Sequence, residues 1–445
     1  MEGISNWKEL TPDQKRQARF KRWLEAPGIK FKNKEAAQLY KTRVTRFIKA
    51  INLEEGDRIP CSLPVGYFPA YYAGYTLKDV MYDYEKQRTA WLKFMKDFGD
   101  MDTFGGPGLV LPAPALEIMD HKIHKWPGHG IGDDVPSYQF VEGEYMKKDE
   151  YDHLIQDPAD FWLRVFLPRQ AGAYEPWANF MHLNPMIGLP MGTIMGFSTP
   201  EMKAMFKKIW AAGEEMGKWM KMVGEVSQTA LGLGYAGFGG GFSGAPYDML
   251  TDMARGTTGI MMDMYRQPEK IHEAMDRLVP IVIETAVASA EDALCPIISM
   301  PLHKGEKGFM SPKAFETFYW PTFKKVLLGL INEGLVPLPF AEGNYIPRLD
   351  VIQDMPKGSM VWYFEYMDMA QAKKTVGKKN CIMGNLPVSI MVTGNAQQVT
   401  DGCKKLIEDC APGGGYILSA AASVDKGNIE NLHAMMDAAK EFGKY

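Results

Sequence analysis

The second half of the chain alternates between short apolar runs and stretches with helical periodicity. Each apolar run is bounded by polar residues or glycine, and the runs are Cys295–Met300, Val336–Ala341, Ser359–Phe364, Cys381–Met383 and Gly415–Leu418. A helical pattern over residues 311–334 separates the first two runs. Apolar strands that alternate with helices at a spacing of about 20–40 residues are typical of βα units around a parallel sheet.

Two helices are predicted before the first strand. Thr11 is an N-cap candidate, followed by proline at the first helical position and glutamine at the third, and this helix should end near Glu25. A second helix is expected over residues 34–50 and a first strand over residues 58–63. No GxGxxG segment opens a helix after that strand, which argues against a dinucleotide-binding fold.

We therefore predict an α/β protein built as a (β/α)8 TIM barrel. The barrel should span residues 56–445, and residues 1–55 should form an N-terminal helical extension.

The overall composition is that of a globular enzyme-sized protein. Of the 445 residues, 46% are hydrophobic and 23% are charged, and the net charge of −4 gives no electrostatic case for nucleic-acid binding. The five cysteines lack CxxC spacing, which is typical of a reduced, cytoplasmic protein. The polar N-terminus and the lack of an apolar stretch of about 18 residues predict neither a signal peptide nor a membrane span.

Polar residues follow all five apolar runs, directly or within three residues. In a TIM barrel the carboxyl ends of the strands converge on the catalytic face, so we expect these residues to line one cavity. They are His303 and Lys304 after the first run, Glu342, Asn344 and Tyr345 after the second, Glu365 after the third, Asn385 after the fourth and Ser419 after the fifth.

The chemistry of these residues allows several roles. Glu342 could be a general acid or base, a ligand of a metal that prefers oxygen and nitrogen, a hydrogen-bond anchor for substrate, or a structural carboxylate bonded to backbone. His303 could donate a proton, bind a metal or serve the structure alone. Lys304 could hold an anionic group, and Tyr67 and Tyr71 could form an aromatic wall for the substrate.

Several segments together resemble the uroporphyrinogen decarboxylase superfamily. These are "RIPCSLPVGYFPAYYAGYTLKDVMYDYEKQ" (58–87), "GDMDTF" (99–104), "MARGTTGIMMDMYRQPEKIHEAMDRL" (253–278), "LHKGEKGFMSPKAFETFYWP" (302–321) and "GGGYILSAAASV" (413–424). The resemblance runs in order from about residue 55 to the C-terminus. The resemblance implies a (β/α)8 barrel. The superfamily includes cobalamin-dependent methyltransferases.

Within the superfamily, the resemblance can be compared with two branches, the true uroporphyrinogen decarboxylases and the methyltransferases. True uroporphyrinogen decarboxylases hold their substrate's carboxylates with arginines near the first strand, whereas no arginine lies between Cys61 and Gly74. Asp102 matches the catalytic aspartate of the decarboxylases. Methyltransferases of the superfamily often bind zinc through a His-x-Cys segment and a later cysteine, but here Phe340, Glu342 and Ala422 stand at those positions. A thiolate zinc site is therefore not expected.

We predict a cobalamin-dependent methyltransferase that moves a methyl group between a small, apolar or aromatic organic substrate and a corrinoid. The corrinoid would be free or carried by a partner protein, since the chain lacks the DxHxxG segment of proteins that hold it. Two alternatives remain: a lyase that decarboxylates a non-porphyrin acid with Asp102, and a non-catalytic subunit that binds a corrinoid or another ligand. If a metal is bound, His303 and Glu342 are its expected ligands.

Overall fold

A curled parallel sheet of seven strands forms the centre of the molecule, in the order β1-β12-β11-β10-β9-β8-β7. The structure is a computed structural model and describes residues 6–182 and 191–445. The strands of this sheet are β1 (Cys61–Ser62), β7 (Gly241–Phe242), β8 (Ile297–Leu302), β9 (Val336–Asn344), β10 (Val361–Tyr366), β11 (Cys381–Leu386) and β12 (Tyr416–Ala420).

The first four apolar runs are neighbouring parallel strands, as predicted. Strands β8, β9, β10 and β11 are neighbours in that order, and each pair is parallel. The predicted first strand is shorter than expected, because only Cys61 and Ser62 pair with β12.

The expected eight-stranded closure is present only in part. A separate two-stranded parallel ladder joins β2 (Thr103–Phe104) to β6 (Ala236–Gly237). Within residues 6–182 and 191–445 no backbone ladder connects β1 to β2. Side chains connect these strands instead: the Asp102 carboxylate accepts the Cys61 N–H at 2.9 Å, and the Thr103 hydroxyl lies 3.4 Å from that of Ser62. The sheet is thus a curled α/β sheet rather than one continuous eight-stranded ladder.

The N-terminal helices α1 (Pro12–Glu25) and α2 (Lys34–Ile51) cover the inner face of the sheet near its amino-terminal end. The predicted capping box is present, since Thr11 and Gln14 cap each other reciprocally. Trp23, Tyr40 and Phe47 are fully buried against apolar side chains of the strands, among them Ile297, Val336, Val361 and Cys381. These helices fill the interior of the sheet from below.

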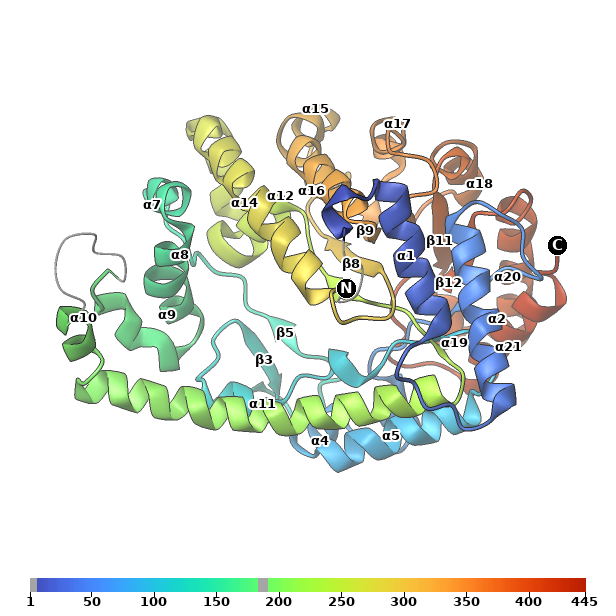
Figure 1. Cartoon of the computed structure of the whole chain (residues 1–445), viewed down its shortest axis with the longest axis horizontal. Helices are drawn as coiled ribbons and strands as arrows, with labels where there is room; N and C mark the ends of the chain where they lie inside the picture. The colour runs from blue at the N-terminus through green and yellow to red at the C-terminus, as the bar shows by residue number, and fades with distance from the viewer. Residues whose placement is uncertain (1–5, 183–190) are drawn as a thin grey trace.

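Other helices pack outside the strands, as Figure 1 shows. The segment expected to be one helix over 311–334 is divided into α15 (Pro312–Ala314), a π-helical turn (Phe315–Tyr319) and α16 (Trp320–Asn332). The remaining helices of this half are α12 (Pro246–Asp248), a π-helical turn (Met249–Arg255), α13 (Gly256–Arg266), α14 (Pro268–Ser289), α17 (Leu349–Ile352), α18 (Met369–Lys374), α19 (Val388–Thr393), α20 (Ala396–Cys410) and α21 (Ile429–Glu441).

The region between β1 and β7 carries the largest additions to the sheet. The long helix α11 runs along one edge of the molecule in Figure 1. The elements here are α3 (Phe68–Tyr72), α4 (Leu77–Tyr82), α5 (Tyr84–Asp97), α6 (Ala113–Ile118), β3 (His124–Pro127), β4 (Gly130–Ile131), β5 (Gln139–Phe140), α7 (Tyr151–Gln156), α8 (Pro158–Phe161), α9 (Leu167–Gln170), α10 (Met191–Gly196) and α11 (Pro200–Gly232). None of the helices in the described ranges has both the length and the apolar character needed to cross a bilayer.

Candidate active site

Four of the predicted site residues, His303, Glu342, Glu365 and Asn385, occupy one layer of the inner face. Residues two apart on a strand face the same side. His303 continues the row of Ile297, and Glu342 continues the row of Val336; both of those residues pack inward against α1 and α2. By the same alternation, Glu365 follows Val361 and Tyr363, and Asn385 follows Cys381 and Met383. The carboxyl ends of four strands therefore present a polar layer above an apolar floor.

His303 lies between two carboxylates. Its Nδ1 is 2.5 Å from Oδ2 of Asp252, and its Nε2 is 3.6 Å from Oε1 of Glu342. Asp252 is largely buried, whereas the side chains of His303 and Glu342 are 40% and 36% exposed. One imidazole nitrogen is therefore fixed by Asp252, and the other faces Glu342 and is open to a substrate.

This arrangement sets the protonation state of the pair. The hydrogen bond to Asp252 raises the pKa of His303 to about 9; burial opposes the shift, and the nearby Glu342 adds to it. Burial raises the pKa of Glu342, an effect that the His303 cation partly offsets and the Glu365 carboxylate reinforces. At neutral pH His303 is thus an imidazolium with a proton to donate.

Asp248 supports this pair from beneath. Its carboxylate is fully buried and accepts hydrogen bonds from the N–H of His303 (3.1 Å), the N–H of Lys304 (2.9 Å) and the hydroxyl of Tyr319 (2.6 Å). Burial raises the pKa of Asp248 to about 6. The bonds to two successive backbone amides hold the chain at His303 in place.

Sequence reasoning did not identify Asp248 and Asp252. They lie four residues apart in "YDMLTDMARG" (247–256), directly after β7, so they share one helical face. Two carboxylates four residues apart, in the segment that follows a strand, were the sequence signal that could have identified Asp248 and Asp252 as site residues.

Lys304 is held within the cluster rather than left free for an anion. Its Nζ lies 3.2 Å from Oδ1 of Asp252 and 4.5 Å from the centre of the Phe309 ring. Lys304 and His303 therefore share Asp252 as a counterion.

Three other predicted residues shape the rim. Glu365 accepts the N–H of Gly343 at 2.6 Å, and the Asn385 amide donates to the carbonyls of Glu365 and Met367 at 3.1 and 3.0 Å. Asn344 accepts the Ile346 N–H at 3.0 Å. Gly343 has a φ of +75°, which favours glycine and lets the chain turn immediately after Glu342.

Tyr345, predicted to bind substrate, lies outside the layer. It is fully buried, and its ring packs edge-on against Phe315 at 6.4 Å, so it belongs to the core beneath the outer helices. Alternation along β9 directs Glu342 and Asn344 to the inner face and therefore directs Tyr345 to the opposite face.

Tyr67 and Tyr71 follow β1, on the carboxyl side of the strand ladder with β12. Tyr67 is buried, its N–H bonds to Asp425 at 3.0 Å, and its ring contacts that of Tyr138. Tyr71 donates to the carbonyl of Pro136 at 3.0 Å. Their contacts are thus with this neighbouring region rather than with His303 or Glu342.

Asp102 does not join the cluster. Asp102 precedes β2, in which Thr103 pairs with Ala236. Ala236 lies five residues before Gly241, and Gly241 pairs with Ile298, which itself lies five residues before His303. Asp102 therefore lies toward the amino-terminal end of the sheet. Its fully buried carboxylate is 2.8 Å from Arg46 and 2.7 Å from Arg58. Asp102 therefore anchors the N-terminal helices in this structure, and its catalytic role stays a prediction.

A thiolate metal site has no counterpart in this layer. All five cysteines are free and buried, and burial raises their thiol pKa values. In the described part of the chain no group of three or more His, Cys, Asp or Glu side chains has the arrangement of a metal site.

Exposed aromatic side chains lie at or near strand ends of this part of the sheet. Phe242, 66% exposed, is level with the inward-facing Ser299, and Tyr366, 63% exposed, ends β10. Phe309, in the segment after β8, is 41% exposed beside Lys304. Large exposed rings of this kind suit a flat, partly apolar ligand.

Comparison with known proteins agrees with this architecture. Residues 238–442 match the family model for uroporphyrinogen decarboxylase (URO-D). The match covers 205 of the 445 residues, a little less than half of the chain. The resemblance found in the sequence is thereby confirmed for the half of the chain that contains His303 and Glu342.

Individual relatives of this family are distant. The uroporphyrinogen decarboxylase of Actinobacillus succinogenes is 22% identical over 223 residues, which cover 46% of this chain and 59% of that protein. The human uroporphyrinogen decarboxylase is 25% identical over 189 residues, covering 39% of this chain and 48% of that protein. The chain thus spans about half to three fifths of the relatives it matches.

A solved methyltransferase from Methanosarcina mazei has the same fold over most of the chain. Its TM-score is 0.54 with 16% identity, and the alignment covers 89% of this chain and 98% of that protein. At this identity the likeness concerns the fold.

Proposed function

We propose that this chain is a methyltransferase that moves a methyl group between an apolar or aromatic organic substrate and a corrinoid. The observation that carries the proposal is the His303 imidazolium, fixed by Asp252 at 2.5 Å and facing Glu342 at the carboxyl ends of the strands. The fold shared with a solved methyltransferase supports it. The same likeness supports a closed (β/α)8 barrel as the complete architecture, and the five free cysteines support a cytoplasmic location.

The chain's residues fit the removal of a methyl group from oxygen. When the methyl–oxygen bond breaks, its electron pair passes to oxygen, and the His303 Nε2 proton can move to that oxygen and leave a neutral hydroxyl. Asp252 stabilises the imidazolium before the transfer and fixes the tautomer after it. Glu342 can accept a hydrogen bond from substrate or return the proton to His303.

The exposed rings fit a corrinoid, which is a large and largely flat macrocycle. Phe242, Phe309 and Tyr366 would hold it through stacking and apolar contact. A bound corrinoid supplies a cobalt centre that takes up or gives the methyl group.

One anaerobic assay tests this proposal against its alternatives. The purified chain is mixed with reduced cobalamin and a set of methoxylated aromatic compounds, and the absorbance of methylcobalamin is followed. We expect methylation that depends on both the protein and the donor. Loss of CO2 from an organic acid instead would support the lyase, and cobalamin binding without either reaction would support the non-catalytic subunit.

A further inference from the structure

The helix α11 (Pro200–Gly232) is longer than its own packing requires. Its 33 residues extend for about 50 Å along one edge of the molecule (Figure 1). One side is buried against the rest of the chain through Met205, Ala212, Trp219 and Val226. The opposite side is exposed over most of its length.

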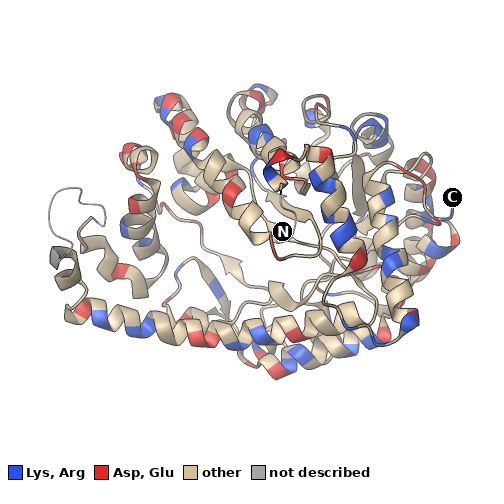
Figure 2. Ribbon diagram, in the orientation of Figure 1, with Lys and Arg blue, Asp and Glu red and all other residues tan. Residues whose placement is uncertain are grey.

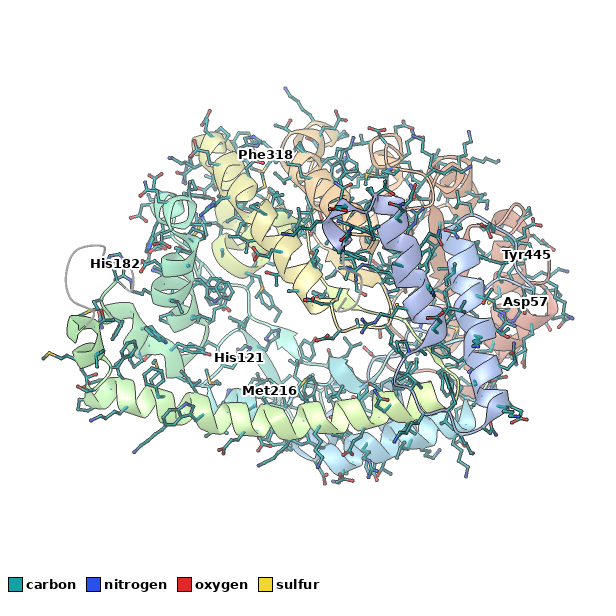
Figure 3. All side chains as sticks on the ribbon, viewed as in Figure 1. Asp57, His121, His182, Met216, Phe318 and Tyr445 are labelled. Atoms are coloured by element: carbon teal, nitrogen blue, oxygen red, sulfur yellow. The ribbon has the colours of Figure 1, made fainter. Side chains whose placement is uncertain are left out.

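The exposed side carries large apolar side chains. Trp210 is 67% exposed and Met220 is 54% exposed. Met216, labelled in Figure 3, is 37% exposed but lies one turn from the buried Ala212 and therefore borders the buried side. Single exposed apolar residues are ordinary, but several along one helix mark a surface that can bind another protein.

Three exposed glycines lie on the same helix. A Cβ atom added at Gly213, Gly217 or Gly224 would meet nothing within 4 Å. Glycine inside a helix costs about 0.5–1 kcal/mol relative to alanine, so packing within the chain does not explain these residues. Glycine does allow the backbone of another helix to come close.

We propose that α11 binds α11 of a second copy of the chain, antiparallel, around a two-fold axis at Gly217. A two-fold axis pairs residues whose numbers add up to about 434. Trp210 then lies opposite Gly224 of the second copy and fills the space that glycine leaves, twice per dimer. Gly217 lies opposite itself, where the two helices cross.

The charges on the flank of this surface match the same register. Lys207 comes opposite Glu225 of the second copy, and Glu214 comes opposite its Lys218, so both pairs join opposite charges. Figure 2 shows charges of both signs along α11, which fits a self-complementary protein partner better than an anionic membrane. Glu225 and Lys218 also contact Arg88 (3.9 Å) and Glu215 (2.7 Å) in their own chain, and such exposed pairs exchange partners at little cost.

A single pair of crossing helices makes an interface at the low end of the range for stable complexes, below about 1,200 Å². We therefore expect a dimer that dissociates on dilution. This inference does not depend on the proposed methyl transfer, because α11 contributes no residue to the cluster around His303.

Disulfide trapping in the full chain tests both the partner and the register. The five native cysteines are buried, so they give little background. Gly217→Cys places two thiols at the axis, and mild oxidation should give a covalent dimer on a non-reducing gel. Gly213→Cys is the matched control, since its two thiols would be separated by eight residues of helix, about 12 Å, which no disulfide spans.

The unmodified chain is measured in parallel by light scattering over a range of concentrations, together with Gly217→Arg. We expect a concentration-dependent dimer, lost in Gly217→Arg without change in melting temperature. A monomer at every concentration with no Gly217→Cys cross-link overturns the proposal. Equal cross-linking of both cysteine variants, or cross-linking of Gly213→Cys alone, also overturns it, because either result excludes this axis.

Discussion

His303 and Asp252 form an ion-paired hydrogen bond of 2.5 Å between the segment after β8 and the helical turn after β7. The two residues are 51 positions apart in the chain, and the parallel pairing of β7 with β8 brings them together. Because Asp252 is also the counterion of Lys304, one carboxylate organises both cations of the candidate site.

The first prediction concerns the pKa of His303. Asp252→Asn removes the largest cause of its rise, so the pKa should fall from about 9 toward its ordinary value of 6.5. The upper pH limit of methyl transfer should fall with it, since the donor must be protonated. The ring-proton resonance of His303, assigned with His303→Gln, gives the pKa directly by NMR.

Stability should depend on pH in the same sense. The folded pKa of His303 lies above its unfolded value, so the pair stabilises the fold fully below about pH 6.5, and this contribution is lost as the pH rises through about 9. The difference in unfolding free energy between the unmodified chain and Asp252→Asn should shrink over that range. Asp276→Asn, which breaks the exposed pair with Lys325, is the control and should show no such trend. A pH-independent difference would contradict the assigned pairing.

The second prediction concerns Glu342. Glu342→Gln keeps the size and hydrogen-bonding capacity of the side chain but removes its ionisation. Methyl transfer should fall by about 10²-fold or more, as for the loss of a general acid or base, with little change in melting temperature. If the purified protein contains a metal, its occupancy should fall as well, and metal analysis of both proteins measures this.

Glu284→Gln on the outside of α14 is the control for that change, since Glu284 is exposed. A Glu342→Gln protein that unfolds readily yet keeps full specific activity while folded would make Glu342 a structural carboxylate.

The strands and their polar ends could be predicted because the signal is local. On β8 to β11 the buried runs are long enough to show where a strand ends, and the polar residue follows directly at His303, Glu342, Glu365 and Asn385. Tyr345 was grouped with Glu342 because both follow the same apolar run, but it lies three positions after Glu342, and strand alternation therefore directs it to the opposite face.

Other parts of the site depend on contacts between distant segments. Asp252 follows β7, a strand of two residues next to a glycine-rich stretch that hides the strand pattern. Asp102 was predicted to be catalytic, but its arginine partners lie 44 and 56 positions earlier in the chain. The charged residues could be identified from the sequence, but the end of the sheet at which each one lies could not be predicted from it.

The third prediction concerns porphyrin substrates. The region Cys61–Gly74 has no arginine, Arg58 is bound to Asp102, and Arg348 is buried against backbone carbonyls. The carboxylates of uroporphyrinogen would therefore be desolvated there without counterions. We expect neither binding nor decarboxylation, measured by chromatography of the porphyrins after oxidation. A true uroporphyrinogen decarboxylase is the positive control, and coproporphyrinogen formed by the purified chain would contradict the prediction.

The last prediction separates a structural from a catalytic role of Asp102. Asp102→Asn leaves Arg46 and Arg58 buried or half-buried without their shared counterion, so the free energy of unfolding should fall by about 3–5 kcal/mol. Asp57→Asn is a matched control, because Asp57 also binds Arg46 but is 54% exposed, and its loss should cost about 0–1 kcal/mol. Urea unfolding measures both values.

The specific activity of the folded Asp102→Asn protein decides the question. If Asp102 only anchors the N-terminal helices to the sheet, methyl transfer by the folded fraction should equal that of the unmodified chain, because the Asp252–His303–Glu342 cluster lies toward the other end of the strands. A variant of unchanged stability that loses activity would instead return Asp102 to the chemistry. Since Asp102 is the residue on which the lyase alternative rests, that result would favour decarboxylation over methyl transfer.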